Sequence, residues 1–261
     1  MRLPRGRTSQ TGGTRLAGFP RMPFHTLARS RYSPALLARV AQGWRRIAEN
    51  ERRGVASAAH IAADLAALGA PPALLAAAAR VIADEVHHLD VCACVLDELE
   101  PSPRGSAVKS ATARRLDLVP RPPAGEHALA RTLVAEYALG KPSSAAAFAA
   151  ARAISREPLF AWAYTELLHA EARHATFGAK TAAWVIRRWS ARQRRALWAQ
   201  ALTASSAAAN TRPNDEEAES LGLLPASSDC TLPRWILPHL APLGIHSTSG
   251  SLPANETRLV H

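Results

Sequence analysis

Glycine and proline interrupt this chain at a few points, and these interruptions constrain its fold more than any other feature of the sequence. Ser33-Pro34 can cap and open a helix, Gly69-Ala70-Pro71-Pro72 can end one helix and begin another, and Glu157-Pro158 marks a second tight turn. Between these points the sequence is rich in Ala and Leu, and no segment alternates apolar and polar residues between turn signals as a β-strand would. We therefore predict an all-α fold.

The interruptions define five long helices and one long connection. We predict helices over about residues 34–68, 72–98, 125–156, 158–189 and 191–209, with a short helix around 232–240. Residues 101–124 contain five prolines and form the connection, and the third helix must kink or restart at Pro142. Two helical hairpins joined by a long crossover is the connectivity of a ferritin-like four-helix bundle. The predicted regions are a disordered basic extension at 1–33, the bundle at 34–209 and a mostly irregular tail at 210–261.

The formal net charge of +11 is concentrated in the N-terminal part of the chain. Residues 1–53 contain twelve Arg and two acidic residues, whereas residues 54–261 carry a net charge of +1. Clustered Arg can bind an anionic partner, but the predicted bundle is nearly neutral. We therefore do not expect nucleic acid to be the partner of the protein as a whole.

Hydropathy and cysteine spacing indicate the compartment. No run of 18 or more uncharged apolar residues occurs, so we expect no transmembrane helix and no membrane partner. The N-terminal region lacks the apolar stretch of a secretory signal, and the three cysteines have neither zinc-ribbon nor C-x-x-C spacing. We expect a cytoplasmic protein with reduced thiols.

The sequence Glu-x-x-His occurs three times, beginning at Glu85, Glu166 and Glu171. Residues i and i+3 share one face of a helix, so a Glu and a His at this spacing can reach the same metal ion. Di-iron carboxylate bundles use two such motifs on different helices, together with a lone Glu from each remaining helix.

Distance from the helical turns selects two of the three motifs. Glu85 lies 13 residues after Pro72 and Glu171 lies 13 residues after Pro158, so both are at the same depth in their hairpins. Glu166 lies about 140° around the helix from Glu171 and cannot share its face. We predict four metal ligands: Glu85, His88, Glu171 and His174. We predict ordinary polar-face roles for His87, Glu166 and His169.

The first helix offers a clear candidate for its lone carboxylate ligand, whereas the third helix does not. Glu51 precedes an apolar stripe that should face the interior, where a carboxylate needs a metal or a partner, so we predict it as a ligand. In the third helix the same offset from the turn falls on Tyr137, next to Glu136, which makes Glu136 a candidate ligand. Lys141 follows closely, and its ammonium would either repel a metal ion or replace one by pairing with carboxylates.

The segments ENERRGVASAAHIAADLAALGAPPALLAAAARVIADEVHHLDVC and LVAEYALGK…REPLFAWAYTELLHAEARHATFG resemble bacterial ferritin-like domain proteins of the di-iron carboxylate superfamily, mostly of unassigned role. The resemblance covers about residues 44–190, and GLLPA at 222–226 is similar to the segment that follows the bundle in that family. It implies ligand roles for the matching residues Glu51, Glu85, His88, Glu171 and His174. In the third helix the family has a Gly-Glu step where this chain has Gly140-Lys141, so the resemblance points to Lys141 and the spacing to Glu136.

The resemblance implies a non-haem centre of two iron ions, although manganese also suits carboxylate and imidazole ligands. One hypothesis is an oxidoreductase that activates dioxygen or acts on a small molecule, with either an intact or a degenerate, mononuclear centre. A second is an iron-binding, ferroxidase-like protein, which would act as a homo-oligomer. A third is a metal-free helical scaffold whose basic tail binds a partner. The sequence identifies no substrate and no catalytic residue.

Overall fold

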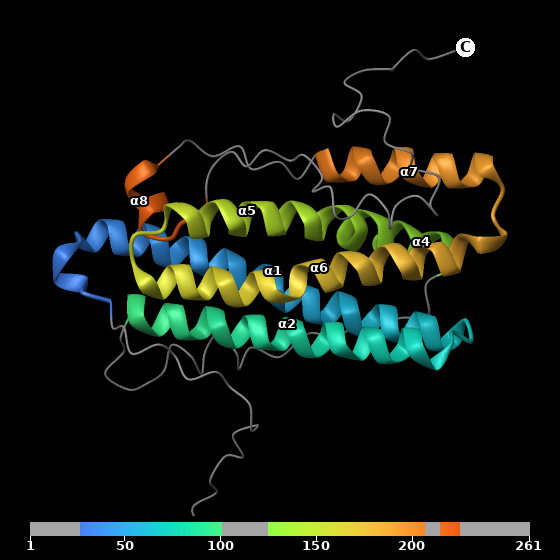
Figure 1. The fold of residues 1–261 in the computed structure, drawn as a ribbon, viewed down its shortest axis with the longest axis horizontal. Helices are drawn as coiled ribbons and strands as arrows, with labels where there is room; N and C mark the ends of the chain where they lie inside the picture. The colour runs from blue at the N-terminus through green and yellow to red at the C-terminus, as the bar shows by residue number, and fades with distance from the viewer. Residues whose placement is uncertain (1–26, 101–124, 207–214, 225–261) are drawn as a thin grey trace, which may run out of the picture.

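The computed structural model describes residues 27–100, 125–206 and 215–224, and these residues are mostly helical with no β-strand among them. The predicted all-α class is confirmed (Figure 1). The predictions for residues 1–26, the connection at 101–124 and the short helix at 232–240 lie outside the described residues. No helix in the described ranges is long and apolar enough to cross a membrane.

The first two helices form a hairpin. Helix α1 spans Pro34–Ala67 and helix α2 spans Pro72–Leu99. Ser33 caps α1 as predicted, because its Oγ accepts a hydrogen bond from the Leu36 N–H at 3.2 Å. Gly69 adopts a φ of 67° in the turn, a backbone conformation that favours glycine. The two helices pack along their length (Figure 1).

The third helical segment changes its geometry in the middle. Helix α4 (Glu126–Thr132) leads into wider π-helical turns, η2 (Leu133–Gly140), and α-helical geometry resumes as α5 (Lys141–Ile154). The predicted restart near Pro142 therefore occurs at the preceding residue, and the backbone remains right-handed helical through Gly140 and Lys141. Proline lacks an N–H and crowds the preceding turn, which favours a local change of this kind.

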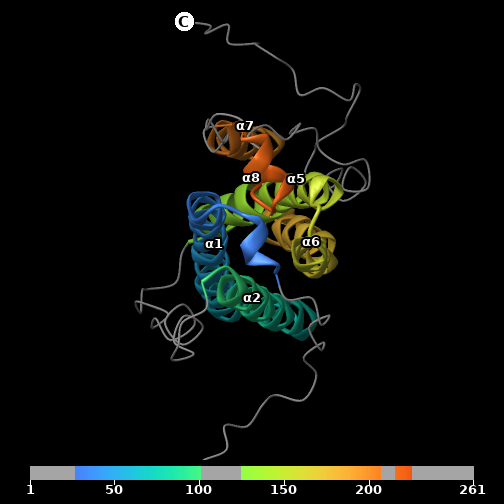
Figure 2. The ribbon, with the colours of Figure 1, turned by 90° about the vertical axis from the view of Figure 1, so that its left-hand side faces the viewer.

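The remaining helices complete the fold. Helix α6 spans Pro158–Val185, the short 3₁₀ turn η3 (Ile186–Arg188) follows, and α7 spans Ala191–Ser206. The α-helix therefore ends slightly before the predicted boundary at residue 189. Helix α6 packs along α5 and η2 and also contacts α2, so the two helical pairs face each other (Figure 2).

Two short segments outside the predicted helices also pack against the interior. Residues 215–224 contain helix α8 (Glu216–Ser220), after which the Gly222 carbonyl accepts hydrogen bonds from Trp44 Nε1 at 2.9 Å and Tyr164 OH at 2.8 Å. Gly222 has a φ of 95°, and a Cβ there would lie 2.3 Å from a ring carbon of Phe160. Within the predicted disordered extension, residues 27–33 are described, and Leu27 is buried.

The interior consists of two apolar clusters. One contains Leu65, Leu133 and Phe177, and the other contains Trp44 and Phe160. The stretches of α1, α2 and α6 between these clusters form a layer with five buried ionisable residues: Glu51, Glu85, His88, Glu171 and His174. Every predicted ligand except Glu136 lies in this intermediate layer and is buried.

Candidate metal centre

The buried layer brings together charged side chains from four helical segments. Glu51 comes from α1, Glu85 and His88 from α2, and Glu171 and His174 from α6. All five are buried, and the most exposed of them, Glu51, is only 5% exposed. The Lys141 side chain enters the same layer from the first residue of α5.

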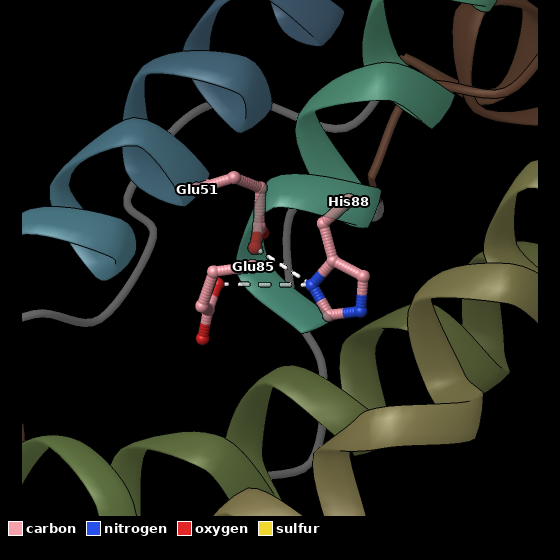
Figure 3. Close-up of side chains that lie close together, drawn as sticks. All are labelled: Glu51, Glu85 and His88. Carbon is pink, nitrogen blue, oxygen red and sulfur yellow. Dashed lines mark hydrogen bonds and ion pairs between the residues drawn. The ribbon is translucent and has the colours of Figure 1, made fainter. Parts of the chain in front are cut away.

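Three of these residues form what we call the first cation position. Glu51 Oε2 lies 3.0 Å and Glu85 Oε2 lies 3.7 Å from His88 Nδ1 (Figure 3). Each of the three residues offers one ligand atom, and these atoms all lie within 4.8 Å of one another. Among the described residues, the buried His88 Nε2 has no hydrogen-bond partner.

The other oxygen of Glu85 belongs to what we call the second cation position. Glu85 Oε1 lies 2.7 Å from Lys141 Nζ and 3.2 Å from His174 Nδ1. Lys141 Nζ also lies 3.4 Å from Glu171 Oε1. Glu85 therefore has one carboxylate oxygen at each position, and the second position contains an ammonium group.

The structure places Lys141, rather than Glu136, with the other predicted ligands. Glu136 is exposed, and its Oε2 accepts a hydrogen bond from Ser57 Oγ at 2.8 Å. The neighbouring Tyr137 is buried, and adjacent residues of a helix point in different directions, so Glu136 is directed outward. Glu136, to which the spacing pointed, therefore lies outside this layer, whereas Lys141, to which the resemblance pointed, lies within it.

Sequence reasoning missed Asp84, which supports the second position from outside. Its Oδ2 lies 3.2 Å from His174 Nε2, and its Oδ1 lies 3.1 Å from an Arg173 guanidinium nitrogen. A carboxylate on the far nitrogen of a histidine fixes the orientation of the ring, as it does for many metal-bound histidines. In the sequence, Asp84 could have been noticed because it directly precedes the predicted ligand Glu85.

Gly54 was also missed. A Cβ at this residue would lie 2.7 Å from Glu85 Oε2, so the absence of a side chain lets the Glu85 carboxylate approach α1. His87 and Glu166, predicted as polar-face residues, lie outside the centre, with His87 Nε2 3.2 Å from Glu166 Oε2. Together with His169 they line a hollow between α2 and α6.

Burial and charge pairing shift the pKa values in this layer. Burial acts to lower the pKa of His88, but hydrogen bonds to Glu51 and Glu85 outweigh it and raise that pKa to about 10. Burial raises the pKa of Glu51. Burial opposes ionisation of Glu85 too, but hydrogen bonds from His174 and His88 and the charge of Lys141 hold its pKa well below the usual range.

The raised pKa of His88 predicts a pH dependence of stability in the metal-free protein. Between about pH 6.5 and pH 10 the folded chain keeps a His88 proton that the unfolded chain releases, so stability is full below this window and decreases as the pH rises through it. Urea unfolding with EDTA from pH 6 to 9.5 measures this slope. We expect His88→Gln to flatten it, whereas the same change at partly exposed His60 should leave it unchanged. Equal slopes in all three proteins would contradict the prediction.

The donors at the first position fit one divalent ion. Two carboxylates and one imidazole suit manganese or iron, and a divalent charge would compensate the two buried carboxylates. The comparisons with known proteins add no assignment, because no protein-family model, no curated protein and no solved structure matches this chain.

Proposed function

We propose that this protein is a ferritin-like four-helix-bundle protein that binds divalent iron or manganese at Glu51, Glu85 and His88, and that with iron it acts as an oxidoreductase on dioxygen. The observation that carries the proposal is the set of three ligand atoms within 4.8 Å of one another in a buried layer. Two helical pairs with Glu-x-x-His motifs at equal depth support the ferritin-like arrangement.

The residues of the chain would hold the ion and control access to it. Glu51 and Glu85 would provide negative oxygen ligands, and His88 would bind as a neutral imidazole after losing its proton. Bound iron would supply electrons and open coordination positions for dioxygen. A pocket of about 520 Å³ lined by residues of α1, η2 and α5 includes Glu51, Lys141 and Phe148, and offers a small molecule a route to the centre.

Metal binding tests the proposal directly. We expect the wild-type protein to bind Mn(II) or Fe(II) in anaerobic titrations, and Glu85→Gln to weaken binding at least 100-fold because it removes a negative ligand. Glu136→Gln makes the same chemical change at an exposed carboxylate and should have little effect. Oxygen consumption after addition of Fe(II) should depend on Glu51 and Glu85 in the same way. Wild-type protein that binds neither metal would overturn the proposal.

One observation favours a second candidate, a metal-free helical scaffold. The three buried carboxylates of Glu51, Glu85 and Glu171 face three groups that can be cationic, namely Lys141, His88 and His174. The layer can therefore be electrically balanced by protons alone. In that case thermal stability would not change when manganese is added, whereas a bound ion stabilises the folded state by mass action.

A further inference from the structure

The two cation positions share one carboxylate but differ in what faces it. At the first position, Glu85 Oε2 faces the His88 ring 3.7 Å away, with Glu51 on the other side. At the second, Glu85 Oε1 faces the Lys141 ammonium 2.7 Å away. Both positions otherwise have the same composition, because each combines Glu85 with one further Glu and one His.

We propose that the Lys141 ammonium replaces the second metal ion of a di-iron centre, so that this protein binds one metal ion where a two-ion centre would be expected. The inference rests on the proposed function, because it concerns the occupancy of the same metal centre. The first position then binds a metal ion, and the second contains the ammonium group of Lys141 instead.

The distances around Lys141 are the first evidence that its ammonium takes the place of a second ion. Its Nζ lies within ion-pair distance of both Glu85 and Glu171, the two carboxylates that a second ion would need. Metal–oxygen bonds of about 2.0–2.2 Å would bring such an ion into the space that the ammonium occupies. The ammonium would also repel the ion in a buried environment, where screening by solvent is weak.

The surroundings of His174 are the second evidence, because they disfavour metal binding by this ring. Its Nε2 lies 3.2 Å from Asp84 Oδ2 and its Nδ1 lies 3.2 Å from Glu85 Oε1. The Nε2 contact has hydrogen-bond geometry, whereas the Nδ1 contact is at ion-pair distance only. A carboxylate beside each nitrogen favours the doubly protonated ring, which has no lone pair for a metal. His88, in contrast, faces Glu51 and Glu85 through Nδ1 alone, and its Nε2 has no hydrogen-bond partner among the described residues. An ion between the two carboxylates can therefore displace the Nδ1 proton while Nε2 keeps its own.

The burial of Lys141 is the third evidence, because it keeps the ammonium beside the two carboxylates. Its side chain is 15% exposed, while those of Glu85 and Glu171 are 0% and 1% exposed. A lysine moved away from this layer would leave two buried carboxylates with one fewer cationic partner, which is unfavourable. Lys141 is thus a fixed countercharge in the metal-free protein and remains one when the first position is filled.

Metal stoichiometry tests this inference without measuring activity. Wild-type protein titrated anaerobically with Mn(II) should bind one ion per chain and give the electron paramagnetic resonance spectrum of an isolated ion. Lys141→Glu should bind two ions and give the spectrum of a magnetically coupled pair. Lys180→Glu makes the same charge change on an exposed side chain of α6 and should still bind one.

The outcomes separate this inference from the proposed function. Two ions in the wild-type protein would overturn the inference and support the proposed function, and no ion would overturn both. A single ion in correctly folded Lys141→Glu would also overturn the inference. If four clustered carboxylates prevent that variant from folding, Lys141→Gln removes the ammonium without adding a charge. It should gain a second, weaker ion, and its failure to do so would count against the inference.

Discussion

Replacement of Lys141 by Met should destabilise the metal-free protein by about 3 kcal/mol, because it removes one partner of a buried group of charges. Methionine is unbranched and apolar and fills much of the same space, so the loss comes mainly from charge rather than from a cavity. The carboxylates that lose their partner, Glu85 and Glu171, are almost completely buried. Urea unfolding at pH 7.5 with EDTA measures the change in the free energy of unfolding.

The pH dependence distinguishes this explanation from a simple packing defect. In the wild-type protein Lys141 helps to keep the pKa of Glu85 low, so its stabilising contribution is present at neutral pH and decreases as the pH falls. In the variant the pKa of Glu85 rises, and the carboxyl group can take up a proton instead. The difference in stability should therefore be smaller at pH 5 than at pH 7.5. Lys180→Met is the matched control on an exposed lysine, and a loss of the same size there would contradict the prediction.

The helices and most of the centre could be predicted from the sequence because their signals are local. Proline and glycine fix helix ends within one or two residues, and Glu-x-x-His fixes two side chains on one face whatever surrounds the helix. Equal distances from Pro72 and Pro158 then placed Glu85 and Glu171 at the same level, and the structure brings both to Lys141.

The third helix could not be resolved by the same counting. The count from Pro158 used the 21-residue separation of Glu51 from Pro72, but Lys141 lies only 17 residues before Pro158. Residues 136 and 137, where the count ended, lie in π-helical turns that follow other geometry than the α-helix assumed. Counting therefore pointed to Glu136, whereas Lys141 lies in the centre. The packing of residues 215–224 against Trp44 and Tyr164 was also missed, since a contact between segments so far apart leaves no local pattern.

Gly178→Ala should have an effect as large as the loss of Lys141, through backbone packing rather than charge. A Cβ on this residue of α6 would lie 2.3 Å from Tyr137 Cβ and 2.8 Å from the backbone nitrogen of Ala138. Both contacts are with the π-helical turns of η2, and neither neighbour is the far end of a flexible side chain. Such overpacking costs about 1–3 kcal/mol, and we expect a loss near the upper end. Chemical denaturation measures it.

This substitution should also weaken metal binding, because α6 carries Glu171 and His174 while η2 leads directly into Lys141. Any separation of α6 from η2 alters the distance between Lys141 Nζ and Glu171 Oε1, now 3.4 Å, and so the charge balance around Glu85. Gly125→Ala is the control, because a Cβ there would meet no atom of the described residues within 4 Å. It should cost only about 0.5–1 kcal/mol, because glycine is preferred to alanine at the N-cap of a helix. If Gly178→Ala were as stable as this control, α6 and η2 would not be in the close contact that sets the Lys141 position.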